Sequence, residues 1–310
     1  MATPDTRFIP AYAKINLSLE ALRRREDGYH DLASIMQTIS LHDTLRMLPA
    51  TNESVDCVCD VETLATQDNL AVRAAHLARS LLSSDAEPGL RVELHKEIPF
   101  QAGLGGGSSD AATVLAVLNR RWRLGMSAES LELASAKLGA DVPFFIRGGT
   151  ASVSGIGERV SALPDIPPLW IVLAMPPARV STPLVFKALT PADFSTGEHT
   201  AALEQLIGRG DALDTRHMVN SLEARAFELF PAIAQARDAL LQAGAPFVRM
   251  SGSGATLFAP FRELADAARV VANAREQGLT VQLTHTVGRD EIAHSRSVVS
   301  EPTEESPCAS

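Results

Sequence analysis

Apolar and polar residues alternate through residues 7–19, which is the pattern of a strand that lies on a core by one face. The residues expected on the buried face are Ala11, Ala13, Ile15, Leu17 and Leu19. Lys14 and Asn16 fall on the opposite face. The pattern therefore predicts a half-buried strand near the N-terminus, with a polar side that an ordinary protein would leave in solvent.

Farther along the chain, the spacing changes repeatedly between the period of strands and the period of helices. Further strands are predicted at 32–48, 91–98, 169–175 and 279–287, with another entered from a glycine-rich turn within 247–261. Helices are predicted at 68–82, from about 108 to 122, at 127–139, 201–208, 213–230, 231–243 and 262–277, and a loop at 187–200. Because the two kinds of element mix without regular β-α-β order, the α+β class is favoured over a doubly wound parallel sheet.

The domain organisation is predicted from the prolines and from the C-terminal composition. Prolines at 164, 167 and 168 interrupt the chain, so we expect a boundary near residue 165, with domains at 1–165 and 166–289. The segment 290–310 is rich in polar residues, which predicts a disordered tail.

Composition and charge exclude several classes of protein. The chain has 310 residues, of which 45% are hydrophobic and 21% charged, as in ordinary globular proteins. Its net charge of −9 and its lack of a large basic cluster argue against nucleic-acid binding. No apolar run is long enough to span a membrane, and the N-terminus lacks the pattern of a signal peptide. With three cysteines, an odd number that suits reduced thiols, we expect a cytoplasmic protein.

The strongest chemical signal is a segment with four glycines in five positions, where a predicted strand passes into a predicted helix. Its residues are Pro99, Phe100, Gln101, Ala102, Gly103, Leu104, Gly105, Gly106, Gly107, Ser108 and Ser109. Glycines let backbone N–H groups approach an anion closely, and a helix N-terminus favours negative charge. The segment therefore predicts a polyphosphate cradle, with a flexible, serine-capped turn as the alternative. It lacks the lysine of a Walker A loop and the surroundings of a dinucleotide fingerprint.

Other candidates are weaker by themselves. Tyr29 and His30 form an aromatic–imidazole pair on a loop, which suits base stacking but also ordinary packing. Asp141 lies among apolar residues, so it is either a partly buried catalytic carboxylate or a turn residue that caps backbone N–H groups. The small-residue turn 251–254 either brings backbone close to a ligand or only makes a tight bend.

Together these segments resemble the GHMP family of small-molecule kinases. The glycine-rich segment matches the family pattern PxxxGLGGGSS, SGSGATLF matches its second glycine-rich motif, and the N-terminal segment matches its first. The motifs AYAKINLSL, DGYHDL and GADVPFF are similar to the branch of the family that acts on a cytidine diphosphate-linked methylerythritol. The resemblance extends from about residue 9 to residue 288.

The resemblance implies a two-domain α+β fold, with an N-terminal half like the second domain of a small-subunit ribosomal protein and a ferredoxin-like C-terminal half. It implies ATP and Mg²⁺, a small-molecule substrate, and phosphorylation of the C2 hydroxyl of the methylerythritol unit in the non-mevalonate isoprenoid route. The catalytic residues would be Lys14 and Asp141. Asn16, Tyr29, His30 and Phe186 would bind the substrate, while the segment 99–109, Asn69 and Lys96 would bind ATP. Ser108 or Ser109 is the candidate ligand for the metal.

Two alternatives stay open at this point. Another kinase of the same family, of the mevalonate or homoserine type, would lack the set of Tyr29, His30 and Phe186. A ligand sensor without activity would lack Lys14 or Asp141, and both are present. The family commonly has Asn-Asp-Leu-Glu where this chain has Asn220-Ser-Leu-Glu223, which leaves the role of that aspartate in doubt. The sequence does not distinguish a monomer from a homodimer.

Overall fold

The computed structural model describes residues 8–50, 53–82 and 89–297. The first lobe contains a six-stranded sheet formed by β1 (Ile9–Arg24), β2 (His30–Pro49), β3 (Val55–Cys59), β4 (Leu90–His95), β5 (Thr150–Gly155) and β6 (Arg159–Ala162). The order is β3-β4-β2-β5-β6, with β1 paired to β2, and only the β3–β4 pair is parallel. Its helices are α1 (Leu70–Ser80), α2 (Gly106–Arg121), α3 (Ala128–Ser135) and α4 (Val142–Arg147).

The second lobe is built on a four-stranded antiparallel sheet, in the order β10-β7-β9-β8. These strands are β7 (Trp170–Ala174), β8 (Arg249–Met250), β9 (Leu257–Phe261) and β10 (Val281–His285). Its helices are α5 (Thr182–Lys187), α6 (Glu198–Arg209), α7 (Glu223–Leu229), α8 (Pro231–Gln242) and α9 (Leu264–Glu276). The α+β class is confirmed. No helix among the described residues is both long enough and apolar enough to cross a bilayer.

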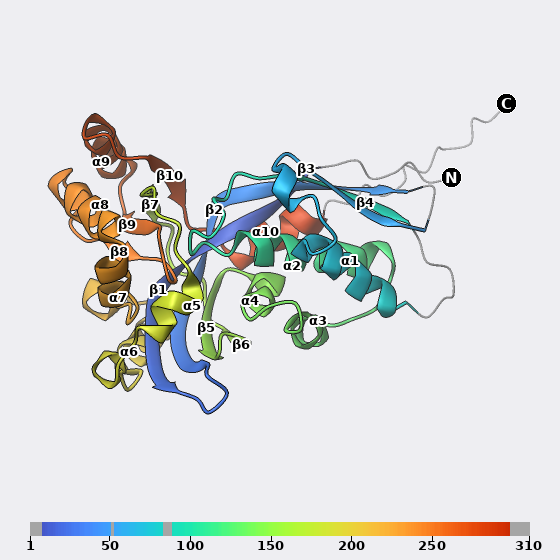
Figure 1. Ribbon diagram of the computed structural model, residues 1–310, viewed down its shortest axis with the longest axis horizontal. Coiled ribbons are helices and arrows are strands. Elements are labelled where there is room, and N and C mark those ends of the chain that lie inside the picture. The colour runs from blue at the N-terminus through green and yellow to red at the C-terminus, as the bar shows by residue number, and fades with distance from the viewer. Residues whose placement is uncertain (1–7, 51–52, 83–88, 298–310) are drawn as a thin grey trace.

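The long hairpin of β1 and β2 joins the two lobes, as Figure 1 shows. Ala13, Ile15 and Leu17 of β1 share one buried cluster with Ile171 and Phe258 of the second sheet. Register shifts after Tyr12, Asn16 and Ala21 interrupt the alternation, so Ala11 packs instead in the core of the first lobe. The residues predicted to share one buried face of this strand therefore pack into different hydrophobic cores.

Several predicted boundaries differ in the structure. The predicted helix 213–230 is wrong, because a short 3-10 turn at Thr215–His217 precedes α7 and the segment between them pairs with β1. The loop predicted for 187–200 gives way to α6 at Glu198, and α2 begins at Gly106 rather than near Ser108. The short elements β3, β6, α4 and α5 carry too little periodicity to have been predicted.

The predicted disordered tail is wrong for residues 290–297. They belong to α10 (Arg289–Ser297), which places Ile292 and Arg296 one helical turn apart in the interior. Two buried residues in a polar stretch give almost no hydrophobic signal, which explains the error. The rest of that prediction, 298–310, lies outside the described residues.

Candidate active site

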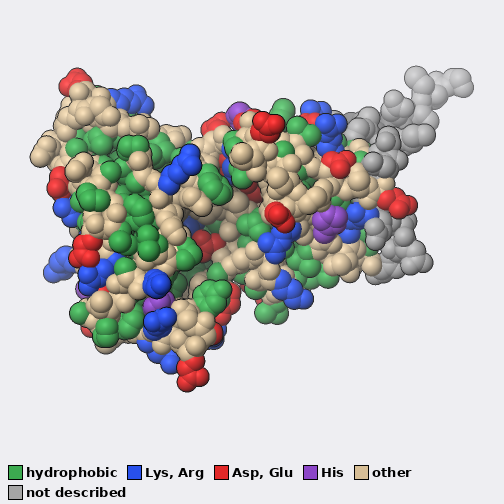
Figure 2. Space-filling view, viewed as in Figure 1, with side chains coloured by type: hydrophobic (Ala, Val, Ile, Leu, Met, Phe, Trp, Pro, Cys, Tyr) green, Lys and Arg blue, Asp and Glu red, His purple; other side chains and the backbone are tan. Residues whose placement is uncertain are grey.

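A cavity of about 650 Å³ lies where the hairpin meets both lobes. Figure 2 shows the surface hollowed between the two halves of the molecule. Among the residues that line the cavity are Lys14, Asn16, Gly103, Gly105, Tyr29, His30, Asp141 and Phe186, which the sequence analysis singled out. Segments far apart in the chain thus meet around one space, which has the size of a typical small-molecule site.

Lys14 is held by a chain of hydrogen bonds on the polar face of β1. Its Nζ donates to Asn16 Oδ1 at 2.7 Å, and Asn16 Nδ2 donates to Ser34 Oγ at 2.8 Å. Lys14 and Asn16 are only 3% and 2% exposed, so the expectation of a solvent-facing side is wrong. The reason lies in the tertiary structure, because this face is covered by the second lobe and by the glycine-rich segment 99–109, which is called the phosphate loop below after its predicted role. The result is an ammonium group of fixed position.

Asp141 faces Lys14 from the start of α4. Its Oδ2 lies 3.7 Å from Lys14 Nζ, and its side chain keeps 35% of its surface exposed. Asp141 occupies the N-cap position of α4 without making a side-chain capping bond, so the turn-capping alternative is not what the structure shows. Burial lowers the pKa of Lys14, and the nearby Asp141 opposes that shift. The pair leaves a carboxylate free to accept a proton next to a fixed cation.

The glycine-rich segment passes close to Lys14 and ends in the first turn of α2. Lys14 N donates to Leu104 O at 3.0 Å, and Gly105 has a φ of 74°. A Cβ at Gly105 would lie 2.7 Å from the Phe145 ring and 3.2 Å from Lys14 Cγ, so no other residue fits without displacement. The first-turn N–H groups of α2 lack partners within the helix, and a helix of this length favours an anion there.

The turn 251–254 packs directly against this loop. Ser251 Oγ donates to Gly103 O at 2.9 Å, and Thr256 N donates to Ala102 O at 3.2 Å. Ser253 Oγ lies 2.7 Å from Thr182 Oγ1 on α5. The turn thereby connects the phosphate loop with the helix that carries Phe186.

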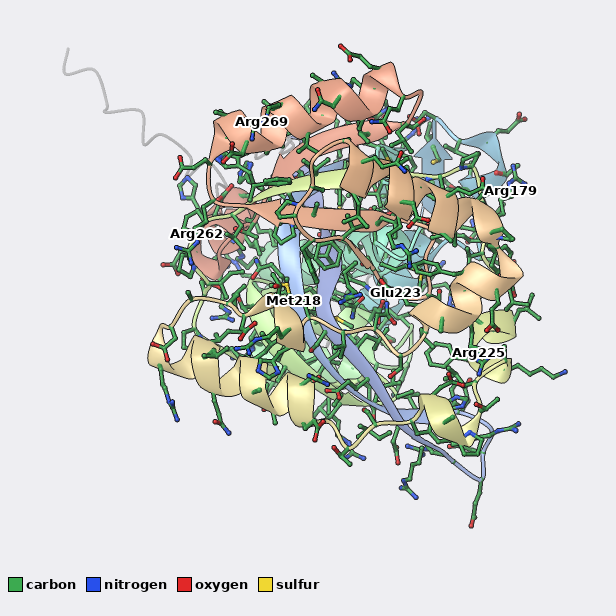
Figure 3. The ribbon with its side chains drawn as sticks, turned by 90° about the vertical axis from the view of Figure 1, so that its left-hand side faces the viewer. Arg179, Met218, Glu223, Arg225, Arg262 and Arg269 are labelled. Atoms are coloured by element: carbon green, nitrogen blue, oxygen red, sulfur yellow. The ribbon has the colours of Figure 1, made fainter. Side chains whose placement is uncertain are left out.

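Asn220, which was not predicted as a site residue, holds this turn. Its Nδ2 donates to Met250 O and Gly252 O, both at 2.8 Å, and its Oδ1 accepts from Leu222 N. Glu223 accepts from Met250 N at 2.7 Å, and Figure 3 shows Glu223 near the middle of this face. The family's aspartate position, Ser221, instead has its Oγ accept from Ala21 N at 3.1 Å.

The predicted base-binding residues Tyr29, His30 and Phe186 line another part of the same cavity. The His30 ring lies 5.3 Å from that of Phe186 and 5.9 Å from that of Phe194, between centroids. Burial, assisted by the charge of Arg24, lowers the pKa of His30, which favours a neutral imidazole. Tyr29 is 61% exposed at the hairpin turn, so one aromatic ring faces open space. Arg24 and Lys187 also line the cavity, and neither was predicted as a site residue.

Other predicted ATP-binding residues lie outside the cavity lining. Asn69 caps α1, where its side chain accepts from Ala71 N and donates to Leu64 O. Lys96 Nζ donates to Asp110 Oδ2 at 2.7 Å and also contacts Asp43 Oδ2, with 8% of its side chain exposed. The structure thus uses both side chains internally, and their role toward ATP stays a prediction. Phe100, in the phosphate loop, is 71% exposed.

The first turn of α2 carries two hydroxyl groups, those of Ser108 and Ser109, that are candidates for holding a metal ion. Ser109 is 0% exposed, and its Oγ has no hydrogen-bond partner in the described part of the chain. Ser108 is partly exposed and lies near Gly139. Residues 8–50, 53–82 and 89–297 contain no group of three side chains suited to hold a metal alone. Magnesium that arrives with phosphates needs only one or two protein oxygens, and the partly exposed hydroxyl of Ser108 can supply one.

Comparison with known proteins decides the family. The model of the GHMP kinases N terminal domain matches residues 69–149, and that of the GHMP kinases C terminal region matches residues 200–279. A protein of Pelotomaculum thermopropionicum named 4-diphosphocytidyl-2-C-methyl-D-erythritol kinase is 38% identical over 89% of this chain and 96% of its own length.

The chain belongs to this family of GHMP kinases. A relative of the same name from Listeria monocytogenes is 42% identical over 86% of this chain and 91% of its own. A crystal structure of 4-(cytidine 5'-diphospho)-2C-methyl-D-erythritol kinase superposes with a TM-score of 0.78 at 36% identity, and covers 91% of this chain and 100% of that one. The chain is therefore a small-molecule kinase with the two-domain GHMP fold.

Proposed function

We propose that this kinase transfers the γ-phosphoryl group of ATP to the C2 hydroxyl of 4-diphosphocytidyl-2-C-methyl-D-erythritol, in the non-mevalonate isoprenoid pathway. The observation that carries the proposal is the continuous cavity, which joins an aromatic–imidazole site at His30 to the Lys14–Asp141 pair beside the phosphate loop. A cytidine base fits the first end, and a hydroxyl acceptor fits the second. We place this reaction in the cytoplasm, where ATP is available.

In this mechanism, Asp141 accepts the proton of the C2 hydroxyl while the oxygen attacks the γ-phosphorus and the bond to the bridging β–γ oxygen breaks. Lys14 orients the hydroxyl and stabilises negative charge on the transferring group. Its bond to Asn16 Oδ1 fixes its position before the substrate arrives, which is the contribution expected of a positioned electrostatic group. The acceptor hydroxyl is tertiary, so alignment matters more than acidity.

Mg²⁺ would accompany ATP and neutralise charge on its phosphates when bound. Ser108 is the preferred protein ligand, since Ser109 is closed off from solvent. The N–H groups at the start of α2 would hold the phosphates. At the other end of the cavity, His30 would hydrogen-bond to the edge of the cytosine, and Phe186 with Tyr29 would stack on its faces.

The test is release of ADP with three acceptors: the cytidyl substrate, mevalonate and homoserine. We expect turnover with the cytidyl substrate only. A preference for mevalonate or homoserine would reject the proposed substrate but keep a small-molecule kinase. Binding of the cytidyl substrate and ATP without ADP release would instead indicate a sensor.

A further inference from the structure

The C-terminal helix α10 contacts three of the elements that build the active site. In Figure 1 it lies beside α2, at the red end of the colour scale. Its buried residues are Ile292, at 2% exposure, and Arg296, at 7%. Ile292 packs with Tyr12, two residues before Lys14 on β1. A Cβ at Gly148, which directly follows α4, would lie only 2.5 Å from Ile292 Cδ1.

Arg296 joins the C-terminal end of α4 to the middle of α2. Its Nη1 donates to Ile146 O at 2.9 Å, near the C-terminal end of α4, and its Nη2 donates to Thr113 Oγ1 at 3.1 Å on α2. α4 has six residues and carries Asp141 at its other end, while α2 begins in the phosphate loop. The guanidinium therefore spans from the helix that presents the carboxylate to the helix that presents the phosphate-binding N–H groups.

This arginine is an unusual choice for an interior position. Among the residues that the structure describes, no carboxylate contributes to the electrostatic environment of this arginine, and its Nε has no hydrogen-bond partner. Burial and the charge of Arg120 lower its pKa to about 10. A buried cation without a carboxylate is costly, and an apolar side chain of the same length would fill the space at lower cost. Stability alone does not explain why an arginine occupies this site.

We propose that Arg296 is a positioning residue, which holds α4 against α2 and thereby sets Asp141 at the right distance from Lys14 and the phosphate loop. The proposal rests on the proposed role of Asp141 as the proton acceptor. Displacement of a catalytic group by about 1 Å can lower a rate by about 10²-fold. Loss of the guanidinium should therefore appear in turnover rather than in ligand binding.

The test is Arg296→Met, with Arg289→Met as the matched control. Arg289 lies on the same helix, and its Nη2 donates to the backbone oxygens of Thr150 and Leu163, so it also makes two hydrogen bonds but none to α4 or α2. We expect Arg296→Met to lower kcat by tenfold or more, with the KM for ATP and for the cytidyl substrate changed by less than about threefold. Arg289→Met should keep kcat within about threefold of wild type.

The decisive readout is a double-mutant cycle with Asp141→Asn. If Arg296 acts by positioning Asp141, Arg296→Met should lower turnover by less than about twofold in the Asp141→Asn background. The proposal would be overturned if Arg296→Met lowered turnover by the same factor in the wild-type and Asp141→Asn backgrounds. It would also be overturned if the Arg296→Met single variant were no slower than Arg289→Met. Arg296→Lys keeps one donor nitrogen in place of the two that Arg296 uses, so it should recover part of the turnover that Arg296→Met loses. If Asp141→Asn alone keeps full turnover, the proposed catalytic role of Asp141 is rejected. Because this single variant is measured within the cycle, that outcome is distinguished from a failure of the role proposed for Arg296.

A second variant covers the case in which Arg296→Met does not fold. Thr113→Val keeps the shape of a side chain that is 0% exposed and removes only the acceptor of Nη2. It should lower kcat by at least threefold at unchanged KM, and this effect should vanish in the Asp141→Asn background. Thermal unfolding of every variant identifies any that is not folded. Unchanged kcat in a folded Thr113→Val protein would contradict the proposed link between α2 and α4.

Discussion

The contact between the phosphate loop and the turn 251–254 can be tested by adding one methyl group. Gly103 has a φ of 77°, and a Cβ there would lie 2.2 Å from Ser251 O and 3.1 Å from Gly254 O. Both are backbone atoms, which cannot swing aside like the end of a side chain. Gly103→Ala should therefore force the loop and the turn apart.

Gly125 provides a matched control. Its φ is 69°, and a Cβ there would meet no atom within 4 Å. Gly125→Ala should cost only the left-handed backbone conformation, about 1–2 kcal/mol, and Gly103→Ala carries the same cost. Overpacking adds about 1–3 kcal/mol at Gly103. The difference between the two variants, about 1–3 kcal/mol, therefore measures the close contact by itself.

The assay compares the free energy of unfolding in urea and the ATP affinity from calorimetry for both variants. We expect Gly103→Ala to be the less stable and to bind ATP more weakly, because the displaced loop no longer presents its N–H groups correctly. Gly125→Ala should bind ATP like the wild type. Equal losses of stability in the two variants, or wild-type ATP affinity in Gly103→Ala, would refute the packing argument.

Three further predictions concern single side chains. Asp141→Asn should lower turnover by about 10²–10⁴-fold while both ligands still bind, as measured by ADP release and calorimetry; turnover within about threefold of wild type would reject Asp141 as the base. Phe186→Ala should weaken binding of the cytidyl substrate by about 1–3 kcal/mol and leave ATP binding unchanged, whereas equal weakening of both ligands would make it structural. Burial raises the pKa of Asp110 from 3.8 to about 7, opposed by the ammonium group of Lys96 and assisted by Asp43. Between about pH 4 and pH 7, Asp110 therefore keeps a proton in the folded state that it has lost in the unfolded state. The stabilisation that this proton provides is complete below about pH 4 and disappears as the pH rises through about 7. Urea unfolding of Asp110→Asn should show a flatter pH dependence over that range, and an unchanged slope would contradict the assignment.

The phosphate loop was predictable because its chemistry is local. Four glycines between a strand and a helix need no distant partner to bring backbone N–H groups together at the start of α2. The same is true of α1, where Asn69 caps a helix with regular apolar spacing. Residue type and short spacing contain all the information that such features require.

The base site was only partly predictable. Tyr29 and His30 lie on one hairpin turn, and Phe186 could be added only through resemblance to the family. The ring of Phe194, which also packs on His30, lies in a segment predicted as loop and carried no signal. Rings from separate elements come together through packing between lobes, which no local pattern records.

Tertiary structure alone decided the environment of the charged groups. The alternation in β1 predicted a solvent-facing Lys14, but the second lobe and the phosphate-loop segment cover that face and make it an interior cation beside Asp141. Lys96 was predicted to contact ATP through resemblance to the family, and nothing in its local sequence indicated that the fold would place its ammonium group between Asp43 and Asp110. Arg296 lay in a polar stretch that predicted disorder, yet it is buried between α2 and α4. Local periodicity shows at most which residues share a side of an element, whereas the burial and the partners of these three side chains depend on other elements of the fold, which only the folded chain brings into contact.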